Sequence, residues 1–152
     1  MTIWLRSAAR STRVLLTLDA TNLDAWMFLG KIMTKRNNPL AVQYFDNALR
    51  LDSTDLEARE WKGVFYKQRG DFDKAFAVYR DIIVRQMVKL AEIGADGLHF
   101  DKLYPTGVNR NPALPVSPDR AETECLLQVV DEVWRRCRDI NPDFALSFES
   151  YW

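Results

Sequence analysis

Two carboxylate side chains hold positions from which they could do chemistry. Asp101 follows the run Gly97-Leu98-His99-Phe100, and Glu149 follows Ala145-Leu146-Ser147-Phe148. Alternation of apolar and polar residues over such short runs predicts β-strands. Acids at the C-terminal ends of neighbouring parallel strands can approach one another, and paired carboxylates about 5 to 9 Å apart can hydrolyse a glycosidic bond. The pair is therefore a candidate catalytic site.

The elements around these acids predict a βαβ unit. We expect a helix from about residue 73 to residue 93, ending at Gly94, and then the first strand. A proline-containing loop follows, and Ser117-Pro118-Asp119 begins a second helix that Pro142 stops. The second strand closes the unit, with both strands parallel in one sheet. The apolar stripe expected on the second helix comprises Leu126, Val130, Val133, Trp134 and Cys137.

The run from Gly94 to Lys102, together with Ser147-Phe148-Glu149, resembles part of a glycoside hydrolase-type (β/α)8 barrel. The resemblance covers about residues 84–152. It implies that Asp101 is the nucleophile and Glu149 an acid or a substrate-binding carboxylate, with His99 and Lys102 beside a carbohydrate. A complete barrel takes about 250 residues and eight strands, whereas this region offers two. The structural alternative is that these acids cap loops or pair with a lysine such as Lys102.

The first half of the chain repeats itself. Gly30 recurs as Gly63, and Phe45 recurs as Tyr79 at nearly the same offset. We call the 33-residue offset from Gly30 to Gly63 the repeat period. Small residues recur where two helices must cross closely, and large apolar residues recur at three- and four-residue spacing between them. With turn residues after each first helix, Asn37 in one copy and Gly70 in the other, this pattern predicts antiparallel helical hairpins.

The motifs resemble those of the tetratricopeptide repeat family. The first copy reads Trp26-x2-Leu29-Gly30-x2-Met33 and then Ala41-x3-Phe45-x2-Ala48; the second reads Gly63-x2-Tyr66 and then Ala75-x3-Tyr79-x2-Ile82. We divide residues 1–83 into a half repeat at 5–21 and repeats at 22–54 and 55–83, with residues 84–152 as a second domain. The start of the chain also carries Arg6, Arg10 and Arg13 without an acid, as mitochondrial presequences do. The half repeat at residues 5–21 is the alternative explanation for this stretch, as the second helix of a hairpin.

The tetratricopeptide resemblance implies a concave groove that binds a peptide or a partner helix. The alternative is that these side chains form an ordinary solvated helix face. The family's clamp for peptide carboxylates needs Lys and Asn where this chain has Met27 and Lys31, so that ligand class is not predicted. The implied groove residues are Asp24, Met27, Lys31, Thr34, Lys35, Glu57, Glu60, Val64, Lys67 and Gln68.

The composition of the chain limits which partners, metals and cofactors we expect it to bind. Lys plus Arg and Asp plus Glu number 21 each, so no overall charge favours nucleic acid or an anionic membrane. The chain has one histidine and two cysteines, Cys125 and Cys137, which lie in one predicted helix beyond disulfide reach. We predict no metal and no cofactor. No apolar run approaches membrane-spanning length, so a soluble, cytoplasmic protein is expected.

Three readings follow. The chain is mainly α, with helical hairpins followed by a short βαβ segment, and acts as a protein-interaction scaffold. Alternatively it is a glycoside hydrolase, or an inactive fragment of one, that uses Asp101 and Glu149. In the third reading the two regions share no stable core. Exposed Leu98, Phe100, Phe148 and Trp152 then drive self-association through unpaired strand edges.

Overall fold

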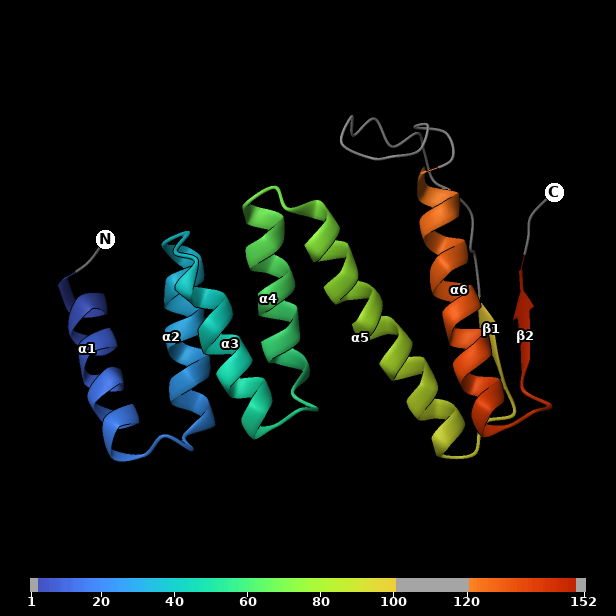
Figure 1. The fold of residues 1–152 in the computed structure, drawn as a ribbon, viewed down its shortest axis with the longest axis horizontal. Coiled ribbons are helices and arrows are strands. Elements are labelled where there is room, and N and C mark those ends of the chain that lie inside the picture. Colours follow the sequence, from blue (N-terminus) through green and yellow to red (C-terminus); the bar gives the residue numbers. More distant parts are fainter. Residues whose placement is uncertain (1–2, 101–120, 150–152) are drawn as a thin grey trace. The chain divides into compact units, whose positions relative to one another are not determined.

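The computed structural model describes residues 3–100 and 121–149, without the side chains of residues 3–5, 121–123 and 125 (Figure 1). The chain divides into two compact units, Met1–Ile82 and Ile83–Trp152. The described part is mainly helical and contains one two-stranded parallel sheet, which confirms the predicted fold class. Helix α5, Phe72–Glu92, begins in the first unit and ends in the second, which confirms the helix expected from about residue 73 to residue 93.

Helices in the first unit alternate in direction, and each short connection returns the chain alongside the helix before it (Figure 1). Helix α2 lies in contact with α1, α3 and α4, and α3 also contacts α4. Short connections between successive antiparallel helices are typical of such an up-and-down arrangement. Besides the start of α5, the helices of this unit are α1 (Ile3–Leu18), α2 (Leu23–Lys35), α3 (Leu40–Leu51) and α4 (Leu56–Gln68).

The same helix-capping bonds recur one repeat period apart in the first unit. The side chain of Asn22 accepts a hydrogen bond from the backbone N–H of Ala25, and Asp55 does the same for Ala58. A capping oxygen satisfies one of the N–H groups left without an intrahelical partner at a helix start. Three further features match at this spacing: the Asp19–Thr21 and Asp52–Thr54 hydrogen bonds, the C-caps Arg36 and Arg69, and the positive φ angles of Asn37 (51°) and Gly70 (74°).

Small residues sit where the hairpin helices cross, as the sequence predicts. A Cβ atom on Gly30 would lie 2.5 Å from Cε1 of Phe45, and one on Gly63 would lie 2.7 Å from Cζ of Tyr79. Only glycine permits the rings to approach the helix backbone this closely. The core cluster around the first of these contacts consists of Ala9, Met27, Leu29, Ile32, Met33, Ala41, Phe45, Ala48, Ala58 and Phe65.

The second unit contains β1 (Gly97–Phe100), α6 (Ala121–Ile140) and β2 (Ala145–Phe148), besides the end of α5. The strands pair in parallel, with Gly97 opposite Ala145 and Phe100 opposite Phe148. Gly94 adopts the positive φ angle (101°) expected of a residue that ends a helix. The buried apolar residues of this unit are Val84, Val88, Ala91, Val129, Val133, Cys137 and Phe144.

The stripe predicted on α6 needs one correction. Val133 and Cys137 are fully buried as expected, but Trp134 is 38% exposed, and Val129 is buried in its place. The guanidinium of Arg138 stacks over the Trp134 ring at 5.0 Å, a contact between residues four apart on the helix surface. A rotation of the buried stripe by less than one residue accounts for the difference, since Val129, Val133 and Cys137 share one helix face.

Candidate interaction surface

The exposed side of the first unit carries eight of the ten groove residues predicted from the sequence. Helices α2 and α4, the first helices of the two hairpins, lie against each other. At 100° per residue, Asp24, Lys31 and Lys35 share one stripe of α2, and Glu57, Val64 and Gln68 share the matching stripe of α4. Glu60 and Lys67 are exposed beside the α4 stripe. The fold therefore brings these eight residues onto two neighbouring helices.

One ion pair joins the two stripes. Nζ of Lys31 lies 2.7 Å from Oε1 of Glu57, with the side chains 31% and 56% exposed. The same ammonium lies 5.8 Å above the centre of the Trp61 ring, whose Nε1 donates a hydrogen bond of 3.4 Å to Glu57. The hydrogen bond from Lys31 is the largest influence lowering the pKa of the Glu57 carboxyl below its ordinary value. This three-residue cluster links α2 to α4 on the exposed side.

Met27 and Thr34 do not line this surface. Met27 is 5% exposed and Thr34 is 1% exposed, and the Thr34 hydroxyl donates its hydrogen bond to the backbone oxygen of Gly30 in its own helix. The equivalent positions on α4, one repeat period later, are the exposed Glu60 and Lys67. Helix α2 packs against α1, α3 and α4, whereas α4 packs against α2, α3 and the start of α5, so equivalent flanks of the two helices have different neighbours.

Two aromatic residues on the surface were not among the predicted set. Phe28 is 40% exposed on the α2 stripe, and Trp61 stands at the equivalent position of α4, half-buried under Lys31. Their separation along the chain is the repeat period itself. That spacing could have identified them, although Trp61 also packs partly against the core cluster, because an aromatic residue that recurs on a solvent-facing stripe is a candidate for an interaction site.

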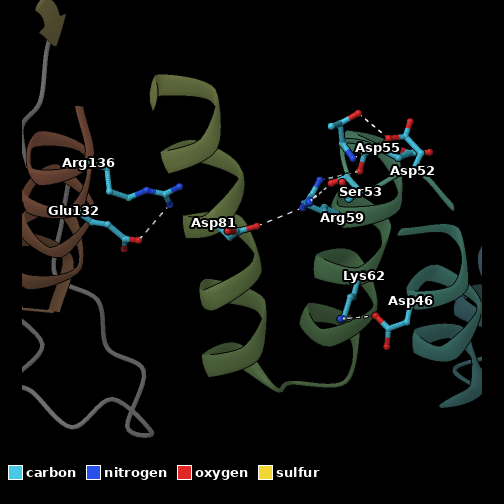
Figure 2. Close-up of polar contacts among 10 residues, drawn as sticks. Asp46, Asp52, Ser53, Asp55, Arg59, Lys62, Asp81, Glu132 and Arg136 are labelled. Carbon is cyan, nitrogen blue, oxygen red and sulfur yellow. Dashed lines mark hydrogen bonds and ion pairs between the residues drawn. The ribbon is translucent and has the colours of Figure 1, made fainter. Parts of the chain in front are cut away.

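The opposite side of α4 is used for packing. Arg59 lies 3.3 Å from Asp81 of α5 and also donates hydrogen bonds to the backbone oxygens of Ser53 and Asp55 (Figure 2). Lys62 reaches Asp46 of α3 at 2.7 Å. These cations face the neighbouring helices, about 140° (Arg59) and about 160° (Lys62) around α4 from Val64. They are committed to internal contacts, whereas the stripe side remains open.

Charge is distributed unevenly along the open surface. Asp24 and Glu57 lie in the first turns of α2 and α4, and Lys35 and Lys67 lie in their last turns. These charges also stabilise the helices that carry them, because acidic side chains interact favourably with a helix N-terminus and basic side chains with a helix C-terminus. Since α2 and α4 run in the same direction, the surface is acidic at one end and basic at the other (Figure 1).

The candidate catalytic site is only partly described. Asp101 and Lys102 lie outside the described residues. His99 is exposed, and its Nδ1 lies 2.9 Å from the hydroxyl oxygen of Ser147 on the paired strand. On the other side of the sheet the rings of Phe100 and Phe148 stack at 5.5 Å. The backbone N–H of Glu149 donates to the backbone oxygen of Phe100, which continues the strand pairing by one residue.

No protein-family model, curated protein sequence or solved structure matches this chain. Both family resemblances therefore remain predictions from the motif residues. None of the described helices combines the length and apolar character that crossing a membrane requires. Within the part of the chain that the structure describes, no three His, Cys, Asp or Glu side chains gather into a metal-binding group.

Proposed function

We propose that the chain is a protein-interaction scaffold that binds a peptide or partner helix along the exposed stripes of α2 and α4. The observation that carries the proposal is the pair of aromatic residues Phe28 and Trp61, set one repeat apart on these adjacent helices. Binding energy at protein interfaces concentrates on a few residues, with aromatic side chains prominent among them. The tetratricopeptide-like motif residues support the same assignment.

Contacts within the chain leave the exposed stripes of α2 and α4 more available to a partner than the back of α4. Arg59 and Lys62 are occupied by α3, α5 and the preceding loop, so the back of α4 offers little to a partner. The stripe side offers two aromatic rings, the apolar Val64 and charged groups at both ends. A partner with a narrow apolar stripe between polar flanks has the complementary pattern.

Uneven charge also predicts the partner's direction. Its basic end would lie beside Asp24 and Glu57, and its acidic end beside Lys35 and Lys67. Opposite charges at a rim steer and orient a partner more than they strengthen the complex. Reversal of both lysines, Lys35→Glu with Lys67→Glu, should therefore slow association and weaken the decline of the association rate with added salt, with a smaller effect on dissociation.

Selection from a displayed peptide library on the intact chain tests the proposal. Peptides recovered this way should lose at least tenfold in affinity, about 1.4 kcal/mol, against Phe28→Ala or Trp61→Ala. Phe72→Ala is the matched control, since Phe72 is 48% exposed in the same unit but lies outside the stripes. Peptides that bind equally well to all three variants would refute the assigned surface.

A further inference from the structure

The ring of Trp61 on the proposed binding surface is covered by a side chain of the neighbouring helix. Nζ of Lys31 on α2 lies 5.8 Å from the centre of the Trp61 ring and 2.7 Å from Oε1 of Glu57 on α4. The Trp61 side chain also packs partly against the core cluster. A partner that uses Trp61 as an anchor, as the proposed function requires, must therefore take the place of the Lys31 ammonium.

Removal of Lys31 leaves a carboxylate and an aromatic ring side by side on α4. Nε1 of Trp61 donates a hydrogen bond of 3.4 Å to Oε1 of Glu57, one helical turn away, which holds the two groups together. The face of an aromatic ring carries negative charge density, and the carboxylate is an anion, so both attract a cation. An apolar group in this place would separate Glu57 from its cation and from water, which costs free energy. The replacement for Lys31 must therefore be a cation as well.

An arginine side chain fits these two groups better than a lysine does. Its guanidinium is planar and carries five N–H donors, so it can stack on an aromatic ring while it donates hydrogen bonds to a carboxylate. The Lys31 ammonium contacts the carboxylate directly, but its 5.8 Å distance from the ring centre is close to the limit of about 6 Å for a cation–π interaction. Lys31 thus satisfies the carboxylate of Glu57 and interacts only weakly with the ring of Trp61.

The contacts of Lys31 are weak enough for a partner to displace them. Its side chain is 31% exposed and that of Glu57 is 56% exposed, and ion pairs this open to solvent contribute little to stability. Arg59 on the back of α4 differs, because its 13% exposed side chain contacts Asp81 and two backbone oxygens. Lys31 can therefore exchange for a better ligand, whereas Arg59 is held in place.

We propose that Glu57 and Trp61 form a recognition site for an arginine side chain of the partner, and that Lys31 occupies this site in the unbound chain. The position agrees with the charge distribution of the surface, whose acidic end comprises Asp24 and Glu57. That a partner supplies the arginine rests on the proposed function. The preference of the site for a guanidinium rests on the contacts of Lys31, Glu57 and Trp61 alone. Lys31 competes with the partner and lowers its affinity.

A small arginine derivative tests the site without any partner. Nα-acetylarginine amide is titrated against the full chain, and the indole N–H signal of Trp61, assigned by its absence from Trp61→Phe, is followed by NMR. The Lys31→Ala chain should bind this probe about threefold or more tightly than the unmodified chain, because the competing ammonium is gone. The uncharged isostere Nα-acetylcitrulline amide should not bind, and Nα-acetyllysine amide should bind more weakly than the arginine probe.

The ion pair between Lys62 and Asp46 provides matched controls. It also joins neighbouring helices at 2.7 Å, with side chains 23% and 49% exposed, but it lies on the back of α4. In the Lys31→Ala background, Glu57→Gln should abolish the response of the Trp61 signal, and Asp46→Asn should leave it unchanged. Lys62→Ala alone should bind the probe as the unmodified chain does. Circular dichroism verifies the fold of each variant, and Lys31→Gln removes the same charge if Lys31→Ala unfolds.

Peptides selected on the intact chain extend the test to the partner. They should contain an arginine whose replacement by citrulline weakens binding about tenfold. Lys31→Ala should tighten their binding, whereas Lys62→Ala should not change it. Selected peptides that need Trp61 but no arginine would refute the arginine site and leave the proposed function standing. An arginine probe that binds as expected, together with peptides that ignore Phe28 and Trp61, would support the site and refute the proposed function.

Three results of the titration would overturn the arginine site. They are the absence of a saturable shift of the Trp61 signal in the Lys31→Ala chain, equal binding of the arginine and citrulline probes, and equal affinity of the Lys31→Ala and unmodified chains for the arginine probe. The first two would show that the site does not recognise a guanidinium, and the third that Lys31 does not compete for it. Equal binding of the lysine probe would overturn the preference for arginine.

Discussion

The ring of Phe45 occupies the space that a side chain at Gly30 would need, and the helices α2 and α3 pack at a distance that this contact sets. The second hairpin repeats the relationship with Tyr79 and Gly63. Burial raises the pKa of the Tyr79 phenol above its ordinary value. Gly30 and Gly63 thus control the spacing between the two helices of each hairpin. Substitution of these glycines gives the most direct test of the fold.

Gly30→Ala should destabilise the chain despite the better helix propensity of alanine. The new methyl group would meet a fully buried ring, and overpacking of this kind costs about 1–3 kcal/mol. The propensity gain of about 1 kcal/mol offsets part of that cost. Urea denaturation measures the change. Phe45→Leu should cost less in the Gly30→Ala background than alone, and equal costs would show that the two residues do not interact.

Lys31→Met should raise the pKa of the Glu57 carboxyl toward its ordinary value. The pKa is lowered in the folded state, so the pair contributes stability above the unfolded-state pKa and loses it as the pH falls through the folded-state pKa. Carboxyl chemical shifts followed by NMR titration measure the change. Lys62→Met, which removes the partner of Asp46, is the control and should leave the Glu57 titration in place.

Arg59→Met should lower the free energy of unfolding by about 1.5–3 kcal/mol, the usual range for hydrogen bonds that involve a charged group. The Arg59 side chain is 13% exposed and holds Asp81 together with two backbone oxygens. Arg135→Met is the control, because its ion pair with Asp131 is 60% and 62% exposed and such pairs contribute about 0–1 kcal/mol. Equal effects in thermal unfolding would contradict the structural role of Arg59.

The Cys137 thiol should resist alkylation in the folded chain. It is fully buried in α6, and burial raises the pKa of the thiol above its ordinary value, which leaves little reactive thiolate. Iodoacetamide labelling in a Cys125→Ser background reports this one group. The labelling rate should rise by orders of magnitude in denaturant. Rapid labelling under native conditions would place Cys137 outside the core of the second unit.

Several elements were predictable because local rules determine them. Asn22 and Asp55 act as N-caps within their own helices, and Gly70 and Gly94 end helices with positive φ angles. The alternation of Gly97-Leu98-His99-Phe100 predicted a strand, and its parallel partner followed from the helix between them. These features depend on neighbours a few residues away along the chain, so they can be predicted from the sequence.

Sequence by itself determined the helices, their caps, the repeat period and the glycines that let rings approach the backbone. Tertiary structure alone decided which side chains on those helices face water. Met27 and Glu60 hold equivalent positions in the repeat, yet one is buried and the other exposed, because α2 packs against α1, α3 and α4 whereas α4 packs against α2, α3 and the start of α5. The physical reason is that burial depends on elements distant in sequence, whereas helix formation and capping depend on residues nearby.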